Sequence, residues 1–205
     1  MNYIMLNGKR IDLTDEQVEE IKSTFSVNQI KLSDVAEGET FKVGNYEFIV
    51  LEHMEDKTAV VLKDLLETSM KFGETNNFND EGCIVRKRLE QFASELEGIV
   101  GEENLITHDV DLTADDGLKD YGITTAKVSL LTCNLYRKYV EILDNYKVEK
   151  WWWLVTPFST PKHDPDNWVK AVAPSGCVHY YFYNYGRGVR PFLHFVSSIS
   201  VSCEE

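Results

Sequence analysis

The segment 151–195 contains half of the aromatic residues of this 205-residue chain and all five of its prolines. It begins with three consecutive tryptophans, Trp151 to Trp153, and ends in the run Gly188 to Phe192. Proline, glycine and asparagine separate its apolar stretches, so we expect short strands in a compact, loop-rich sheet. Tyr and Trp join a large apolar area to a polar edge, which suits either a recognition surface or the core of such a subdomain. For the tryptophans these two interpretations stay open.

The net charge of −13 at pH 7 is confined to residues 1–150, because the charges of 151–205 cancel. This excess opposes binding to phosphate backbones and to anionic lipid, so we expect no direct binding of nucleic acid. An acidic face can instead mimic nucleic acid, although a charge run is more often a solvated surface. The carboxylates that concentrate between residues 90 and 120 include Glu95, Glu97, Glu102, Glu103, Asp109, Asp111, Asp115, Asp116 and Asp120.

Length and hydrophobicity bound the class of protein. With 205 residues, 43% of them hydrophobic, the chain can bury a core as one domain, alone or with a small appendage. Its start lacks the apolar run of a signal peptide, and no stretch reaches the ~20 apolar residues of a membrane-spanning helix. We therefore expect no membrane span and synthesis in the cytoplasm, with association with a virion as an open alternative.

The cysteines and histidines show no ligand spacing. Cys83, Cys133, Cys177 and Cys203 form no CxxC pair, which argues against a zinc knuckle or a dithiol redox motif. The histidines form no HxH or HExxH pattern, and the chain has no GxSxG nucleophile motif. We therefore expect no catalytic residue, no metal ion and no cofactor, and folding that needs neither a metal nor a disulfide.

The first 30 residues form a separate small piece in this interpretation. Residues 4–13 alternate loosely about Asn7-Gly8, which predicts a hairpin. Thr14 to Gln17 matches a capping box, and Val18, Ile21 and Phe25 follow at helical spacing, whereas 26–31 resembles a linker. Such a piece is too small to be stable alone. We therefore expect residues 1–30 to be an attachment element that docks the body, 31–205, on a larger assembly or on a second copy.

The body mixes strands and helices, so the sequence predicts an α+β fold. Apolar alternation predicts strands, apolar residues at intervals of three and four predict helices, and polar runs rich in Asn, Asp and Gly predict loops. The expected elements are a three-stranded meander over 41–62, helices over 64–72 and 85–100, an irregular acidic excursion over 107–127, a buried strand over 128–131 and a capped helix over 135–143.

Five short motifs occur in order between residues 32 and 196. They are a strand pair of the form G-E-x-F-x-V-G-x-Y-x-F-x-V-L, an Asn-containing loop, a strand ending in L-L-T, a W-W-L-x-[TS]-P block and a G-V-R-P run. In this chain they are Gly38 to Leu51, Asn76 to Phe78, Leu130 to Thr132, Trp152 to Pro157 and Gly188 to Pro191. In these motifs the chain resembles a domain family of unknown function (DUF6273-like) found in bacteria and their phages.

The resemblance implies a C-type-lectin-like fold, shared with sulfatase-modifying proteins and with the variable proteins of diversity-generating retroelements. It implies no demonstrated activity, and oxidase chemistry of the sulfatase-modifying kind needs a closely spaced cysteine pair, whereas Cys177 and Cys203 are far apart. Arg190 precedes a proline, so we expect it in extended backbone. There its guanidinium would hold a loop through carbonyl or carboxylate contacts. Trp152 and Trp153 are expected in the core, with Trp151 facing out.

Two polar and aromatic loops, 159–168 and 179–187, lie between these motifs. Their residue types are reachable by mutating adenines in Asn codons, as in retroelement-diversified lectin folds. If 179–185 is a strand, Tyr181, Tyr183 and Tyr185 share one face with His179, so that one face packs and the other is free to bind. We expect a protein or glycan ligand to contact His163, Asp164, Asp166, Asn167, Trp168, His179, Tyr181, Tyr183, Asn184, Tyr185 and Arg187.

The sequence thus predicts a non-catalytic ligand-binding protein, borne by a phage or mobile element, that displays aromatic residues of segment 151–195 on a C-type-lectin-like body. The alternative is an acidic phage-encoded inhibitor whose region 90–120 occupies the nucleic-acid channel of a host enzyme. A degraded sulfatase-modifying enzyme is a third possibility. For calcium-dependent sugar binding, Asp164, Asp166 and Asn167 supply only a thin cluster of oxygen ligands.

Overall fold

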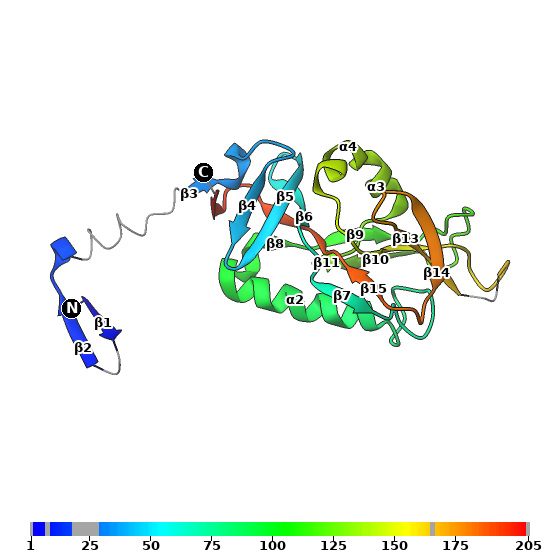
Figure 1. Cartoon of the computed structure of the whole chain (residues 1–205), viewed down its shortest axis with the longest axis horizontal. Coiled ribbons are helices and arrows are strands. Elements are labelled where there is room, and N and C mark those ends of the chain that lie inside the picture. Colours follow the sequence, from blue (N-terminus) through cyan, green and yellow to red (C-terminus); the bar gives the residue numbers. More distant parts are fainter. Residues whose placement is uncertain (1, 7–8, 18–28, 165–166, 204–205) are drawn as a thin grey trace.

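Two layers of core packing lie on opposite faces of the β-structure, and the strand sequences explain both. The computed structural model describes residues 2–6, 9–17, 29–164 and 167–203 (Figure 1). In β5 (Tyr46–His53), Phe48 and Val50 face one core, whereas Ile49 and Leu51 face the other. Successive side chains of a strand point to opposite faces, so a run that is apolar throughout is buried on both.

The larger sheet contains the predicted meander at its centre. Its strands follow the order β11-β16-β6-β5-β4-β17-β3, and β8 also pairs with β16. The β4-β5-β6 portion is antiparallel and confirms the prediction for 41–62. The other strands of this sheet are β3 (Gln29–Lys31), β4 (Thr40–Val43), β6 (Lys57–Leu62), β8 (Leu105–Ile106), β11 (Val128–Ser129), β16 (Phe192–Val196) and β17 (Ser200–Ser202).

A second sheet collects most of the aromatic segment, as the proline and glycine punctuation predicted. Its order is β14-β13-β12-β15-β7, with β12 and β15 parallel and the other neighbours antiparallel. Trp153 and Val155 face the first core and Trp152 and Leu154 the second, so the tryptophan pair is core, as expected. The strands are β7 (Glu67–Met70), β12 (Trp152–Pro157), β13 (Trp168–Val172), β14 (Val178–Phe182) and β15 (Arg187–Val189).

Helices cover the two sides of these sheets. The long helix α2 (Ile84–Val100) lies along one side, and the short helices α3 (Cys133–Lys138) and α4 (Val140–Leu143) lie on the other (Figure 1). In α2 the predicted stripe of Leu89, Phe92 and Leu96 is buried. The Thr132 hydroxyl accepts from the Leu135 N–H at 3.1 Å and caps α3, also as predicted. Single 3₁₀ turns are η1 (Leu32–Asp34), η2 (Glu102–Asn104) and η3 (Asp144–Tyr146).

The G-V-R-P run connects the two sheets. Gly188 pairs with Trp152 across β15 and β12, and a Cβ atom at Gly188 would lie 2.5 Å from Leu65 Cδ1 and 3.1 Å from Trp151 O, so a larger residue there would displace the Leu65 side chain. Arg190, buried with its side chain 1% exposed, donates to Leu62 O at 2.9 Å, to Lys63 O at 2.8 Å and to Tyr146 O at 3.0 Å. This confirms the expectation that the guanidinium holds loops through carbonyl contacts.

Four sequence predictions differ from the structure. The expected helix 135–143 is two short helices, α3 and α4, interrupted at Tyr139. The expected helix 64–72 is instead strand β7, because Glu67 to Met70 pairs with β15. The acidic excursion 107–127 contains an antiparallel ribbon of β9 (His108–Asp111) and β10 (Ile123–Ala126). Residues 29–31 of the expected linker form β3, which pairs with β17. β7 and β3 pair with strands that are distant in the sequence, so tertiary pairing decides their conformation, whereas β9 and β10 pair with each other.

The hairpin and capping box predicted near the start of the chain are confirmed within the described residues. β1 (Asn2–Leu6) pairs with β2 (Lys9–Leu13), with Leu6 opposite Lys9. The Thr14 N–H donates to Gln17 Oε1 at 3.0 Å, and the Gln17 N–H donates to Thr14 Oγ1 at 3.2 Å. Tyr3 and Ile11 are exposed. The expected helix residues Val18, Ile21 and Phe25, and the Asn7-Gly8 turn, lie outside the described residues.

Truncating Trp153 should unfold a large part of the protein. Its ring is fully buried against Phe72, and its Nε1 donates to Met70 O at 2.8 Å. Trp153→Ala should lower the free energy of unfolding by about 3–5 kcal/mol, measured by chemical denaturation. The matched control is Ile99→Ala, whose side chain is half exposed on α2. That control should cost less than about 1 kcal/mol.

Deleting residues 1–28 should leave the body folded, because β3 and everything after it stay in place. A deletion of 1–31 removes β3 and the hydrogen bonds that it makes with β17, so it should melt several degrees lower. Melting curves compare the two deletions, and size-exclusion chromatography tests whether residues 1–28 mediate assembly. An equal loss of stability in both would mean that the hairpin is part of the body.

Candidate functional site

The strand β14 forms one edge of the five-stranded sheet, and its sequence, Val178-His179-Tyr180-Tyr181-Phe182, contains three aromatic residues and no charged carboxylate or amine. Figure 1 shows β14 at the margin of the body opposite β3. Its only partner among the described strands is β13, with Lys170 opposite Tyr180. Aromatic side chains lie on both faces of this edge, and they form two separate clusters.

The first cluster, named here the Arg187 face, surrounds a guanidinium. Arg187 Cζ lies 3.8 Å from the ring centroid of Tyr181 and 5.6 Å from that of Tyr185. Trp151 contacts His179 and Tyr181 edge to face, at centroid distances of 5.3 and 4.9 Å. These are cation–π and T-shaped geometries that stabilise aromatic groups beside a cation. The sequence thus correctly placed His179, Tyr181, Tyr185 and Arg187 together, and Trp151 joins them.

The second cluster, named here the Tyr180 face, consists of Phe158, Trp168, Lys170, Tyr180 and Phe182. The Tyr180 ring lies 4.6 Å from that of Phe158 and 5.6 Å from that of Trp168, and Trp168 also contacts Phe182 at 5.4 Å. Lys170 is buried below Tyr180 and Phe158, within 6 Å of both ring centroids. Of this cluster only Trp168 was among the expected contact residues.

The aromatic residues are distributed between the two faces of β14 differently from the expectation. The strand ends at Phe182, so Tyr183, Asn184 and Tyr185 lie in the following turn, which the Tyr185 N–H closes by donating to Phe182 O at 3.0 Å. Tyr181 and Tyr183 pack partly against the first core. Among the tyrosines of residues 178–187, Tyr180, 47% exposed, and Tyr185, 53% exposed, are the most open to solvent. Alternation alone cannot say which face of an edge strand the body covers, and this is why Tyr180 was missed.

The other predicted loop, 159–168, is only partly directed to β14. His163 is exposed, and its Nδ1 lies 3.3 Å from Asp116 Oδ2. The Asp164 N–H donates to Thr160 O at 3.0 Å, whereas Asn167, at φ 53°, leads into Trp168. Asp166 lies outside the described residues. Among the described residues no group of three or more His, Cys, Asp or Glu side chains is arranged to hold a metal ion.

Buried Asn76 fixes the loop to the sheet. Its Nδ2 donates to Ser159 O at 2.9 Å and to Trp168 O at 3.2 Å, and its Oδ1 accepts from the Tyr121 hydroxyl at 2.7 Å. All three bonds are made by one side chain that is 1% exposed. The asparagine of the loop motif, Asn76, therefore holds the aromatic edge in position and does not hold a ligand.

Carboxylates of the acidic excursion 107–127 bond to β13 and to the loop 159–168. Asp115 Oδ2 accepts from Lys170 Nζ at 2.9 Å, and Asp116 Oδ2 accepts from the Ser159 hydroxyl at 2.7 Å. Burial alone would raise the pKa of Asp116, but hydrogen bonds, from Ser159 above all, lower it below its usual value. These two carboxylates therefore have structural roles.

Ser159 and His163, both in the loop 159–168, do not form a nucleophile–base pair. Ser159 Oγ and His163 Nδ1 both approach the same oxygen, Asp116 Oδ2. Within the described residues the histidine is not hydrogen-bonded to the serine, as a general base would be. Burial raises the pKa of the Cys83 thiol to about 11, which disfavours the reactive thiolate.

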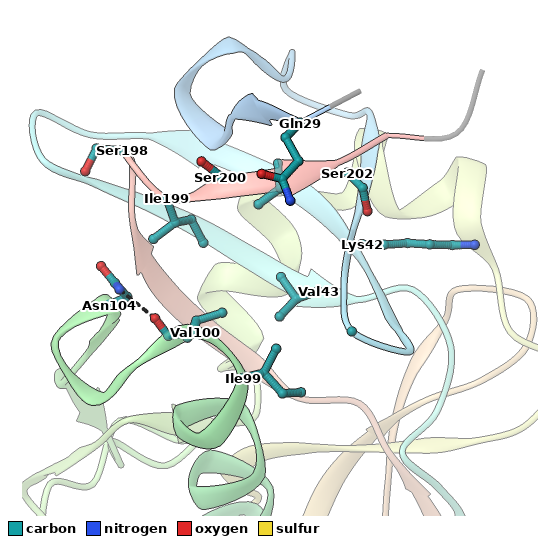
Figure 2. Close-up of a pocket in the computed structure, with 12 residues that line it drawn as sticks. Gln29, Lys42, Val43, Ile99, Val100, Asn104, Ser198, Ile199, Ser200 and Ser202 are labelled. Atoms are coloured by element: carbon teal, nitrogen blue, oxygen red, sulfur yellow. Dashed lines mark hydrogen bonds between the residues drawn. The ribbon is translucent and has the colours of Figure 1, made fainter. Parts of the chain in front are cut away.

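A cavity away from the aromatic edge lies between β4 and β17 near the end of α2 (Figure 2). These strands pair only at Lys42 and Ser202, so they diverge and leave a space of about 470 Å³. Figure 2 shows Val43, Ile99 and Ile199 around this space, with serines on the β17 side. Lys42 is the one charged residue of its lining, so the cavity lacks convergent catalytic groups. Its lining residues are Gln29, Lys42, Val43, Gly44, Ile99, Val100, Asn104, Ser198, Ile199, Ser200, Val201 and Ser202.

Sequence reasoning missed a pair of buried histidines. His108 on β9 and His194 on β16 lie with ring centroids 4.8 Å apart, and His108 Nε2 is 2.9 Å from the Ser129 hydroxyl. Within the described residues neither Nδ1 atom has a hydrogen-bond partner. Burial lowers the pKa of His108 to about 4 and that of His194 to about 3. Both rings are therefore neutral at pH 7.

Comparison of the chain with protein-family models, with curated proteins and with solved structures finds no match in any of the three. The helices of the described residues are all too short or too polar to cross a bilayer. What the molecule does must therefore be argued from its own surfaces.

The histidine pair should make the protein acid-sensitive. The unfolded chain takes up protons on these histidines near pH 6.5, whereas the folded state resists protonation until about pH 4, so stability is complete above pH 6.5 and falls as the pH decreases. At about 1.36 kcal/mol per pKa unit, each histidine contributes at most about 3–5 kcal/mol to this loss. Chemical denaturation between about pH 7 and about pH 5 measures the slope.

A variant pair isolates this contribution. His194→Phe should flatten the slope, since the substituted ring cannot be protonated. His163→Phe, at an exposed position, should keep the slope of the unaltered protein. Equal slopes in all three proteins would assign the acid sensitivity to carboxylates instead.

Proposed function

We propose that this protein is a non-catalytic binding protein that recognises a macromolecular ligand through the aromatic edge of its five-stranded sheet. The observation that carries the proposal is the exposure of Tyr180 on the strand edge and of Tyr185 in the turn that follows it, each about half open to solvent. Rigid aromatic anchors held by packed neighbours are what binding hot spots require. The proposed contact set is Trp168, His179, Tyr180, Tyr181, Asn184, Tyr185 and Arg187.

The supporting shell favours binding rather than mere packing. Lys170 is buried under Tyr180 and neutralised by Asp115, and Asn76 fixes the backbone beneath Trp168. Side chains positioned in this way lose little conformational freedom when a ligand binds. Tyr180 and Tyr185 themselves remain open to solvent. Buried polar contacts therefore hold an exposed surface in place.

The inhibitor alternative finds less support. Mimicry of nucleic acid needs carboxylates that are free to replace phosphates, but Asp115 pairs with Lys170 and Arg137, and both Glu97 and Glu102 pair with Lys127. These pairs place cations beside carboxylates of the acidic region 90–120. A solvated acidic face is the simpler account.

The C-type-lectin-like fold is part of the proposal as well. The α+β architecture is compatible with the C-type-lectin-like fold that the motif resemblance implies, and the roles of Arg190 and Trp153 fit motifs that hold such a scaffold together. A diversified origin of residues 159–187 and carriage by a phage remain part of the same proposal. A reverse transcriptase gene with a near-copy of this coding segment beside it would support that origin.

Removing the two exposed tyrosines should abolish binding without unfolding the protein. Tyr180→Ala combined with Tyr185→Ala should melt within a few degrees of the unaltered protein. The unaltered protein is first screened on displayed peptides and on a glycan array. Any ligand found should bind the double variant at least ~30-fold more weakly, from roughly 1–4 kcal/mol per anchor.

The matched control changes two exposed apolar residues outside this surface, Ile99→Ala with Ile123→Ala, and should leave binding unchanged. Tyr183→Ala should behave differently from Tyr185→Ala, because Tyr183 packs on the core and its loss should lower the melting temperature. Unchanged binding in the tyrosine double variant, or loss of binding in the isoleucine control, would place the recognition surface elsewhere.

A further inference from the structure

We infer that β14 binds an extended peptide segment of a partner protein, which adds to the five-stranded sheet as a sixth strand. This inference rests on the proposed function and names the class of its ligand. It depends on three features of the edge: the direction of its backbone groups, the lack of any device that blocks pairing, and a cation on one face.

Along β14, residues that bond to β13 alternate with residues that do not, and this alternation determines which backbone groups face outward. The Ala173 N–H donates to Cys177 O at 2.9 Å, and the Tyr183 N–H donates to Asn167 O at 3.4 Å. Both pairs belong to the same register as Ala171 with His179 and Val169 with Tyr181. In an antiparallel pair, bonded and non-bonded positions alternate. His179 and Tyr181 therefore bond to β13, and the backbone groups of Val178, Tyr180 and Phe182 point away from it.

This outward row is open along its centre. Within the described residues no hydrogen bond involves the N–H or C=O of Val178 or Tyr180, and only Phe182 O is used, by the Tyr185 N–H. Edge strands are usually blocked by lysine, proline, an inward charge or a bulge. β14 has none of these and pairs with β13 in unbroken register. An unblocked edge with regular spacing is the template for strand addition.

The two faces of β14 determine which side chains the added peptide strand should have. On the Arg187 face the guanidinium donates to Gly186 O at 2.6 Å, and no carboxylate of the described residues forms an ion pair with it. An acidic side chain of the ligand would supply the missing counter-charge. On the Tyr180 face the neighbours are Phe158 and Trp168, which suit an apolar side chain. Successive residues of a strand alternate between faces, so the expected ligand alternates acidic and apolar residues.

The geometry favours a peptide over a glycan because a sugar would stack on the exposed rings but leave the outward N–H and C=O row of β14 without regular partners. A peptide satisfies the rings and the backbone row together. A glycan ligand is accordingly an outcome that the experiment must distinguish.

The test begins with selection of random linear peptides displayed on phage against the full-length protein. Synthetic copies of a selected peptide are then methylated at one backbone nitrogen at a time, with the protein unaltered. Methylation removes a donor, so alternate positions should lose roughly tenfold or more in affinity while the positions between them change little. Selected sequences should alternate acidic and apolar residues, and Arg187→Gln should weaken them by roughly tenfold.

Two variants of β14 provide the matched comparison on the protein side. Tyr180→Ala removes the ring and keeps the outward N–H, whereas Tyr180→Pro removes both, and this N–H makes no bond within the sheet. Tyr180→Pro should bind roughly tenfold more weakly than Tyr180→Ala. Amide hydrogen exchange gives a readout that needs no variant: Val178 and Tyr180 amides should exchange rapidly in the free protein and become protected when the peptide binds.

The outcomes separate this inference from the proposed function. Peptides or glycans that require Tyr180 and Tyr185, but show no alternating methylation effect and no protection of the Tyr180 amide, would overturn strand addition and leave the aromatic surface as the binding site. Ligands that bind the Tyr180→Ala, Tyr185→Ala double variant as well as the unaltered protein would overturn both. Alternating methylation effects with protection of Val178 and Tyr180 would establish the sixth strand.

Discussion

The buried guanidinium of Arg190 holds the junction between the two sheets together. Arg190 lies where the chain passes from β15 of the smaller sheet to β16 of the larger one, and its guanidinium donates to Leu62 O, Lys63 O and Tyr146 O. Burial lowers its pKa to about 10, which still leaves it protonated at neutral pH. A buried charge is costly unless it is fully hydrogen-bonded, so the three carbonyls are needed as much as the arginine.

The aromatic edge depends on this junction through a short chain of contacts. Arg190 also lies over the Trp152 ring, with Cζ 5.4 Å from its centroid, and Trp152 belongs to β12, the central strand of the smaller sheet. β12 pairs with β13, and β13 pairs with β14. The orientation of Tyr180 is therefore set by a rigid sheet whose far side is fixed to the rest of the molecule. A surface built on strands in this way is more precise than one built on loops alone.

The sequence allowed local elements to be predicted where the signal was local. The stripe of α2, the Thr132 cap and the 41–62 meander are each determined by residues close together in the chain, and all are confirmed. The strand β7 was mistaken for a helix because β15, its partner, follows more than a hundred residues later. For the candidate site, composition identified the segment, but the contribution of Tyr180 depends on which face of β14 the body covers. The buried His108–His194 pair likewise arises from tertiary contact and has no sequence signal.

The pairing of β3 with β17 has a geometrical consequence. These are the first and last strands of the body, and they lie side by side at the end of the molecule opposite β14 (Figure 1). Anything joined before Gln29 or after Ser202 therefore leaves the body at one place, far from the aromatic edge. Tethered there to a particle or to another chain, the body would act as a spacer with its tyrosines pointing outward. Fusions at either end would then leave access to the edge unobstructed, and many copies on one support would present their edges to the same side.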